Sequence, residues 1–350
     1  MQSHATMTTY GPSLLRRVPL FASVISIIAL ASGLAGCAFD SDDELTDEAA
    51  YDVKDGKKNK NKNKGNGGGK NEPKNEGRRF DVLTHNVGGG AENDDGLVGI
   101  SYTFSRIKAT NPDVVMLEEV CYAQYQAFLQ AFPGWSVLFA PMTENIGGEK
   151  CGGTPKGQLL ASPRAMTEAI RQDLGDPDGA KYFTLLCGEV PIPNTARKVL
   201  ACVTHLRAQG NDPAAAEAAR DRQVWRIANA LNPRANSGQA VVIAGDFNAS
   251  PGKKALDHLY RLTRFGNYNG GKFDEADQSN PNRERYANRE DVRCAADACR
   301  SGEGTMTNNA AKLDHVFFSH NRISGRMGAE IEGSGGSGHK LYRAWAKLDL

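Results

Sequence analysis

Three features that would place a protein in a class at once are missing from this 350-residue sequence. Net charge is almost absent, because 42 Lys and Arg face 41 Asp and Glu, so the charge of +1 does not mark a nucleic-acid-binding protein. The apolar run from Val18 to about Leu30 is too short to indicate a membrane span. The cysteines do not follow zinc-ribbon or zinc-finger spacings, which disfavours a zinc module.

The first 36 residues have the pattern of an export signal. Arg16-Arg17 precede the apolar run, and Leu34-Ala35-Gly36-Cys37 follows it as a small-residue cleavage site ahead of a thiol. This ending resembles a bacterial lipoprotein box, in which the cysteine carries lipid. We therefore predict a signal peptide over residues 1–36, lipidation of Cys37, and an extracytoplasmic protein anchored to the cell membrane. The alternative is a plain secretory signal with an incidental cysteine.

Residues 37–78 contain almost nothing apolar to bury. Residues 38–50 are acidic, and residues 54–79 consist largely of Lys, Asn and Gly. Such a composition predicts a disordered tether, and a solvated spacer between membrane and enzyme is the favoured interpretation. The alternative is an electrostatic arm for anionic polymers such as nucleic acid, or for anionic lipid.

Export would place the remaining chain where disulfides form. Six cysteines follow Cys37, and an even number fits three disulfides, although six cysteines allow fifteen connectivities. Two of them are close enough to clip one loop, two lie in strand-like runs that could pair as a hairpin, and two are left to each other. The pairs favoured in this way are Cys294–Cys299, Cys187–Cys202 and Cys121–Cys151.

The folded domain is predicted over residues 79–350. Strands and helices interleave without a regular βαβ rhythm, which favours a mixed sheet with helices packed outside it. Residues 166–174 have helical propensity, and residues 265–311 are polar and should be rich in loops. The patterns predict strands over 80–87, 114–117, 135–139, 158–161, 182–187, 199–206, from 241, 313–319 and 340–348, and helices over 97–109, 121–132, 213–231 and 253–262.

Polar side chains recur where these strands end. An apolar run beginning at Val241 stops at Gly245-Asp246-Phe247-Asn248, and residues two apart on an extended chain point the same way. A carboxylate beside an amide suits a phosphate ester, its attacking water or a divalent cation. Singly, each such residue would be a turn former, a strand-edge acid or a core histidine. Together they predict a cleft at a sheet edge: Asn86, Glu119, His205, Asp246, Asn248, Asp314 and His339.

In this order the motifs resemble the deoxyribonuclease I-like endonuclease/exonuclease/phosphatase superfamily, over about residues 80–350. The resemblance implies a four-layer α/β sandwich of two mixed β-sheets flanked by helices, with sheet in place of the helix over 166–174. The matching motifs are Leu83-Thr84-His85-Asn86-Val87, Leu117-Glu118-Glu119, Thr204-His205-Leu206, Gly245-Asp246-Phe247-Asn248, Leu313-Asp314-His315-Val316 and, in part, Ser337-Gly338-His339.

The resemblance also implies a metal site. Glu119 is similar to the principal ligand of a divalent ion, normally Mg²⁺, and Asn86 to the residue that helps to hold metal and phosphate. The family's last motif is usually Ser-Asp-His, so Gly338 removes an acid that normally coordinates the metal. We therefore expect weakened metal binding, with a need for high Mg²⁺ or a preference for Mn²⁺. Glu118 stands where many relatives have Gln.

The remaining roles are implied in the same way. Asp246 resembles the acid that orients or activates the attacking water, and Asn248 the amide that grips the phosphate. His205 resembles the histidine that stabilises the phosphoryl oxygens, and His339 the general base partnered by Asp314. Such chemistry needs no nucleophilic side chain, because a metal neutralises charge and a His–Asp pair fixes the imidazole.

The sequence thus predicts a monomeric, extracytoplasmic, metal-dependent phosphodiester hydrolase whose substrate is nucleic acid. One alternative is a hydrolase of small or lipid phosphoesters, similar to a sphingomyelinase or phosphoinositide phosphatase. Another is a degenerate binding module that has lost activity with the acid at Gly338. His85 and His315 flank motif residues and should face away from the site, so we expect structural roles for both.

Overall fold

The computed structural model describes residues 77–89, 97–142, 151–175, 183–262, 269–279, 300, 302–309 and 311–350. The predicted signal peptide, Cys37 and the tether lie outside these residues, as do Cys294 and Cys299. Within the described ranges, no helix combines the length and the apolar character needed to cross a membrane.

Two six-stranded mixed sheets form the centre of the fold. In the first, β1 and β2 run parallel and the other neighbours antiparallel; in the second, β7 and β8 are the parallel pair. The first sheet has the order β11 (Ile323–Ile331), β12 (Tyr342–Leu348), β1 (Arg78–Asn86), β2 (Val114–Cys121), β4 (Lys156–Ser162) and β3 (Ser136–Pro141). The second has the order β5 (Thr167–Asp173), β6 (Thr184–Pro191), β7 (Lys198–His205), β8 (Ala240–Asp246), β10 (Asp314–Ser319) and β9 (Phe273–Glu275).

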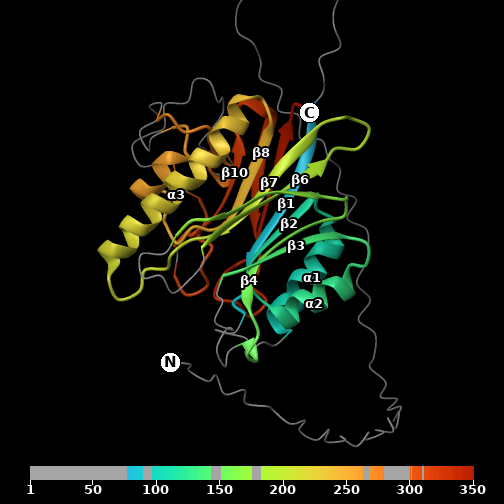
Figure 1. Cartoon of the computed structure of the whole chain (residues 1–350), viewed down its shortest axis with the longest axis vertical. Coiled ribbons are helices and arrows are strands. Elements are labelled where there is room, and N and C mark those ends of the chain that lie inside the picture. The colour runs from blue at the N-terminus through green and yellow to red at the C-terminus, as the bar shows by residue number, and fades with distance from the viewer. Residues whose placement is uncertain are drawn as a thin grey trace, which may run out of the picture. The chain divides into compact units, whose positions relative to one another are not determined.

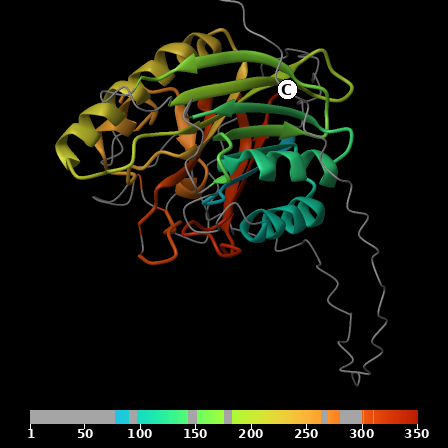
Figure 2. The same ribbon diagram turned by 60° about the horizontal axis from the view of Figure 1, so that its bottom comes forward.

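Helices cover the outer face of each sheet. Figure 1 shows α1 (Val98–Thr110) and α2 (Tyr122–Ala131) on one side of the strands and α3 (Pro213–Asn236) on the other, and the turned view of Figure 2 agrees. The 3-10 helix η2 (Lys254–His258) packs with α3 on the second sheet. This is the four-layer sandwich expected from the sequence, and it gives three apolar layers: one between the sheets and one under each group of helices.

Strand residues face alternate layers, which explains the near-continuous apolar runs in the sequence. On β1, Val82 packs between the sheets while Leu83 packs under α1. On β8, Val242 packs between the sheets while Val241 and Ile243 pack against α3. Because both faces of a central strand are buried, most positions in it are apolar until the strand leaves the sandwich.

Two sequence predictions about local structure need correction, and one strand was missed. The helical propensity of residues 166–174 is overridden by pairing with β6, so the segment is edge strand β5, as the family resemblance implied. The helix predicted over 253–262 is only the short η2, and no helix covers its last four residues. Strand β11 was not predicted at all, although it completes the first sheet beside β12.

Two of the three predicted disulfides are present. Cys187 and Cys202 join β6 to β7 as register partners with Cα atoms 4.1 Å apart. Cys121, at the end of β2, is bonded to Cys151, with Cα atoms 5.5 Å apart. Disulfides persist in oxidising compartments, so both bonds are consistent with the predicted export.

Candidate active site

The topology brings the polar strand ends together at one edge of the sandwich. Parallel pairing of β1 with β2 places Asn86 beside the Glu118-Glu119 end of β2. Parallel pairing of β7 with β8 puts His205 in register with Asp246. Strand β10 runs antiparallel to β8, so its first residue, Asp314, lies opposite Asp246. Five strands therefore deliver their side chains to one place.

Unusual backbone conformations aim these side chains. Glu119 has φ +56° in an irregular stretch of the β2–β4 pairing, and Asn248 has φ +49° just after β8. Gly245 has φ +144°, and a Cβ there would lie 1.9 Å from the carbonyl oxygen of Thr204. Left-handed conformations of non-glycine residues concentrate at functional sites, because the surrounding structure must hold them.

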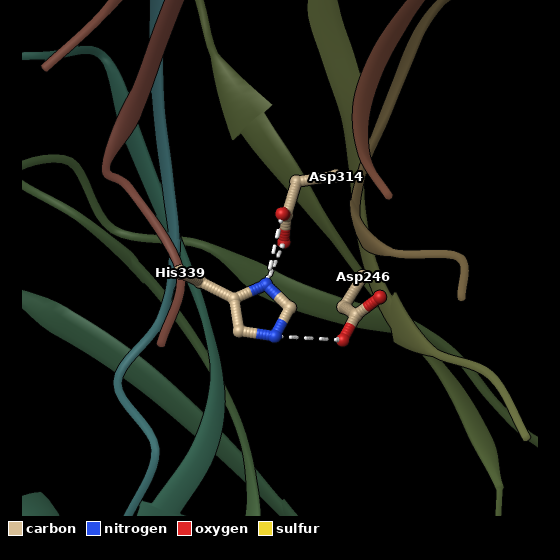
Figure 3. Close-up of side chains that lie close together, drawn as sticks. All are labelled: Asp246, Asp314 and His339. Atoms are coloured by element: carbon tan, nitrogen blue, oxygen red, sulfur yellow. Dashed lines mark hydrogen bonds and ion pairs between the residues drawn. The ribbon is translucent and has the colours of Figure 1, made fainter. Parts of the chain in front are cut away.

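His339 lies between two aspartates (Figure 3). Its Nδ1 is 2.9 Å from Oδ2 of Asp314, and its Nε2 is 3.6 Å from Oδ2 of Asp246. Burial lowers the pKa of His339, but the charges of Asp314 and Asp246 outweigh burial and raise it to about 10. The ring is therefore an imidazolium at neutral pH, with Nδ1–H donating to Asp314 and Nε2–H directed to the Asp246 side.

The two aspartates have different protonation tendencies. Burial raises the pKa of Asp246, and the negative charge of Asp314 raises it further, although His339 and His205 oppose both. Burial also disfavours the ionised form of Asp314, but the charge and hydrogen bond of His339 outweigh it and lower that pKa. Asp314 is thus the fixed anion of the pair, and Asp246 is the carboxylate that accepts a proton more readily.

Asp246 and Glu119 share two neighbours. The Asn86 side-chain amide donates to Asp246 Oδ2 at 3.1 Å and to Glu119 Oε1 at 3.4 Å, while its oxygen accepts from the Gly88 backbone N–H. His205 Nε2 lies 3.4 Å from Asp246 Oδ2 and 3.9 Å from Glu119 Oε1. The two carboxylates are therefore bridged by one amide nitrogen and one imidazole.

Lys156, the first residue of β4, was not identified from the sequence. Its Nζ is 2.5 Å from Glu119 Oε2. Burial raises the pKa of Glu119, but His205 and Lys156 together lower it to about 2, so this carboxylate stays ionised. The sequence offered little signal, because Lys156 lies two residues before the strand predicted over 158–161.

The other predicted site residues lie at the same edge in supporting positions. The Asn248 backbone N–H donates to Asp246 Oδ1 at 2.8 Å, and its side-chain amide donates to the Leu206 carbonyl at 3.0 Å. Ser337 accepts from the His339 backbone N–H and donates to the Asn86 carbonyl. These contacts fix the loop that carries His339 to the end of β1.

His85 and His315 are buried away from the site. Burial lowers the pKa of His85 to about 4 and that of His315 to about 3, so both rings are neutral. Because the His339 carbonyl only accepts, His85 must donate to it from Nε2, at 3.1 Å. His315 Nε2 in the same way donates to the Ala249 carbonyl. Both histidines hold backbone in place, as expected, and His85 supports the loop of His339.

The donor set fits a divalent cation. Carboxylate oxygens of Asp246 and Asp314 lie within 4.8 Å of each other beside the protonated ring of His339, and Glu119 adjoins Asp246 through Asn86. Carboxylate oxygens are the donors that hard divalent ions prefer. Gly338 contributes no carboxylate, and its carbonyl accepts from the backbone and the hydroxyl of Thr307.

Comparison with known proteins identifies the family of this chain. The sequence model of the Endonuclease/Exonuclease/phosphatase family matches residues 83–335, most of the chain, and the protein belongs to this family. Its members are phosphoester hydrolases of the nuclease and phosphatase type and generally depend on a divalent metal. No curated protein sequence matches the chain.

Solved structures share the fold at low identity. Truncated Caenorhabditis elegans TDP2 superposes with a TM-score of 0.53 at 14% identity, covering 77% of this chain and 98% of that one. The human Nocturnin catalytic domain with bound sulfate gives 0.54 at 16% identity, covering 77% and 94%. A family protein from Bacteroides thetaiotaomicron gives 0.54 at 15% identity, covering 78% and 99%.

Proposed function

We propose that this chain is an extracytoplasmic, Mg²⁺- or Mn²⁺-dependent nuclease held to a membrane by lipid on Cys37. The observation that carries the hydrolytic part is the His339–Asp314 pair facing Asp246, with Glu119 beside them. Export is supported by the signal and lipoprotein-like motif and by the two disulfides.

Asp246 is assigned as the group that accepts a proton from the attacking water. Its Oδ2 is held by the Asn86 amide and lies close to both His205 and His339. Burial raises its pKa, which makes it a stronger base than an ordinary aspartate and brings its proton affinity closer to the working pH. Asn248 fixes the other oxygen, so the carboxylate presents Oδ2 in one orientation.

His339 is assigned as a proton donor to the phosphoryl group or its leaving oxygen. Nδ1–H donates a hydrogen bond to Asp314, so Nε2–H is the proton that can be given to the substrate. The raised pKa of about 10 keeps this proton in place at neutral pH. The assignment differs from the general-base role implied by the family resemblance, and a pH profile separates the two.

Glu119, with Asn86 beside it, is the carboxylate that would hold the divalent ion. A bound ion supplies positive charge to the phosphoryl oxygens, which a phosphodiester needs before water can attack. Because Gly338 stands where an acid is usual, we expect this ion to bind weakly.

Two features favour nucleic acid as the substrate. The Lys- and Asn-rich stretch within residues 54–79 would attract polyanions. Tyr122 is 42% exposed, follows the disulfide-bonded end of β2, and has its ring 5.6 Å from that of Tyr125. Tyr122 is three residues after Glu119 in the chain, and an exposed aromatic ring suits stacking with a nucleobase.

The test is a substrate panel. Full-length chain purified in detergent is offered plasmid DNA, RNA, bis(4-nitrophenyl) phosphate and sphingomyelin vesicles, with Mg²⁺ or Mn²⁺ and with EDTA. We expect metal-dependent cleavage of nucleic acid that is lost in His339→Gln. His320→Gln is the matched control, because His320 pairs with Asp274 at 2.6 Å outside the site and should keep full activity.

Other outcomes select the alternatives. Hydrolysis of sphingomyelin without cleavage of nucleic acid would identify a lipid phosphodiesterase, which the predicted anchor would also serve. No turnover of any substrate with either metal would leave a binding module without catalysis.

A further inference from the structure

Lys156 forms an ion pair with Glu119, the carboxylate that is expected to hold the metal. Its Nζ lies 2.5 Å from Glu119 Oε2, and the two side chains are only 26% and 18% exposed. An ammonium group and a divalent ion both require the negative charge of this oxygen. The two cations therefore cannot use Glu119 Oε2 at full strength at the same time.

The root of the Lys156 side chain is fixed by the backbone around it. Lys156 is the register partner of Cys121 on β2, and its carbonyl accepts from the Met142 backbone N–H at 2.9 Å. The preceding residue, Pro155, accepts from the Tyr122 N–H, also at 2.9 Å. The Cys121–Cys151 disulfide also holds this part of the backbone. Lys156 therefore starts from a fixed position beside Glu119.

The other oxygen of Glu119 is also occupied. Oε1 accepts from the Asn86 amide at 3.4 Å and lies 3.9 Å from His205 Nε2. The site therefore differs from an ordinary carboxylate metal site in two ways that act together. It lacks the usual acid at Gly338, and it carries an extra cation on the principal acid that remains.

We propose that Lys156 is an internal competitor of the divalent ion for Glu119. Its ammonium neutralises the carboxylate in the metal-free protein, and the metal must displace it to bind there. The side chain is partly exposed at the site and has a flexible four-carbon stem, so it can leave without unfolding β4. This inference rests on the proposed function for the presence of a metal, and it adds what sets the metal requirement.

Metal affinity without substrate tests the competition directly. Mn²⁺ binding to the full-length chain is measured by the electron paramagnetic resonance signal of the free ion. Lys156→Met, and Lys156→Gln as a second variant, should bind Mn²⁺ about tenfold more tightly than wild type, because an ion pair no longer has to break. Lys156→Arg keeps the charge and should bind as wild type does.

Two controls locate the effect. Lys198→Met removes a lysine that pairs with Glu189 at 2.9 Å on the distant ends of β6 and β7, and should leave Mn²⁺ affinity unchanged. Adding Glu119→Gln to Lys156→Met should abolish the gain, since the liberated carboxylate is then gone.

Unchanged affinity in both neutral variants would overturn the proposal, and so would a gain that survives Glu119→Gln. Tight binding by Lys156→Arg would also overturn it, because charge would then not be the cause. Since no substrate is present, a chain that hydrolyses nothing can still pass this test. Failure of the proposed function would show only in the substrate panel.

Discussion

The sandwich contains two clusters of acidic side chains that differ in their position and in their exposure to solvent. One lies at the strand ends and consists of Glu119, Asp246 and Asp314. The other joins the two sheets in the interior, where Glu275 and Asp277 meet Lys312 and Tyr342. Both clusters combine carboxylates with cations and hydrogen-bond donors, so residue type alone does not distinguish them.

The interior cluster is neutralised by the chain itself. Lys312 Nζ lies 3.1 Å from Glu275 and 3.6 Å from Asp277, and the Tyr342 hydroxyl donates to Glu275 at 2.7 Å. The backbone N–H of Gln278 donates to the second oxygen of Glu275. All of these carboxylates are closed off from solvent.

The strand-end cluster has backbone strain, partial exposure at Glu119, and the carboxylates of Asp246 and Asp314 close to His339. A cluster that is closed to solvent and paired within the chain stabilises the fold. One that stays partly exposed is available to a cation and a substrate.

The largest expected effect is at His339. His339→Gln should lower kcat for the cleaved substrate by about 10³-fold, because general acid–base groups contribute rates of this order. Steady-state kinetics measures the loss, with circular dichroism to show that the fold is kept. Retention of more than a tenth of the activity would place the chemistry outside the strand-end cluster.

The pH profile of the wild type completes this test. If His339 donates its proton, activity should fall as pH rises towards its pKa of about 10, since the imidazolium is then lost. An activity that instead keeps rising up to that pH would return His339 to the general-base role.

At Lys312, in the interior cluster, we expect a loss of stability without a loss of activity. Lys312→Met leaves Glu275 and Asp277 without their cation in the interior, and should lower the free energy of unfolding by about 3–5 kcal/mol. Urea denaturation measures this change, and kcat of the folded fraction should stay at the wild-type value. A stability loss below about 1 kcal/mol would erase the difference between the two clusters.

Much of this arrangement could be predicted from sequence, and the reasons are local. Central strands such as β8 are buried on both faces, so their apolar runs stand out, and polar residues mark where they end. Parallel neighbours end at the same edge of a sheet, which brings Asn86 to Glu119 in one sheet and His205 to Asp246 in the other.

What could not be predicted depends on tertiary contacts. Strand β11 contains Gly328, where a Cβ would lie 2.1 Å from the ring of Trp345 on the neighbouring strand. A glycine weakens the strand pattern in sequence, and only the partner explains it. Lys156 could not be predicted as a site residue because lysine is usually solvated. Its pairing with Glu119 depends on the irregular β2–β4 register.

A smaller effect is expected at Glu118, which lies next to the open cluster but is fully buried. Burial raises its pKa well above the ordinary value, and Asp314 and Asp246 raise it further, so the carboxyl keeps its proton to a higher pH than an exposed glutamate does. The Thr84 hydroxyl donates to its Oε1 at 3.0 Å. A glutamine matches a neutral carboxyl in shape.

Folding with a raised carboxyl pKa gives stability that is present below the unfolded value and lost as pH rises above it. Glu118→Gln removes this loss. The variant should equal wild type near pH 4.5 and be more stable than wild type at pH 8. Urea unfolding at the two pH values measures the difference, and a variant less stable at pH 8 would show that Glu118 is ionised like its neighbours.

The smallest effect is expected at Tyr122, the exposed first residue of α2. Tyr122→Ala should raise KM for nucleic acid about fivefold by removing a stacking surface, with no change for bis(4-nitrophenyl) phosphate. Leu129→Ala is the matched control, because Leu129 is also exposed on α2 but lies two turns away. An equal rise in KM for both substrates would mean that Tyr122 shapes the site rather than binding a base.

Gly245 limits how this enzyme can diverge. Any side chain there would collide with the Thr204 carbonyl and push β7 away from β8, which would take His205 out of register with Asp246. A saturation library at position 245 should therefore return only glycine among active clones, whereas positions such as Tyr122 should tolerate many residues. Surface positions can therefore change during evolution and alter the substrate, whereas position 245 should remain glycine in every active descendant.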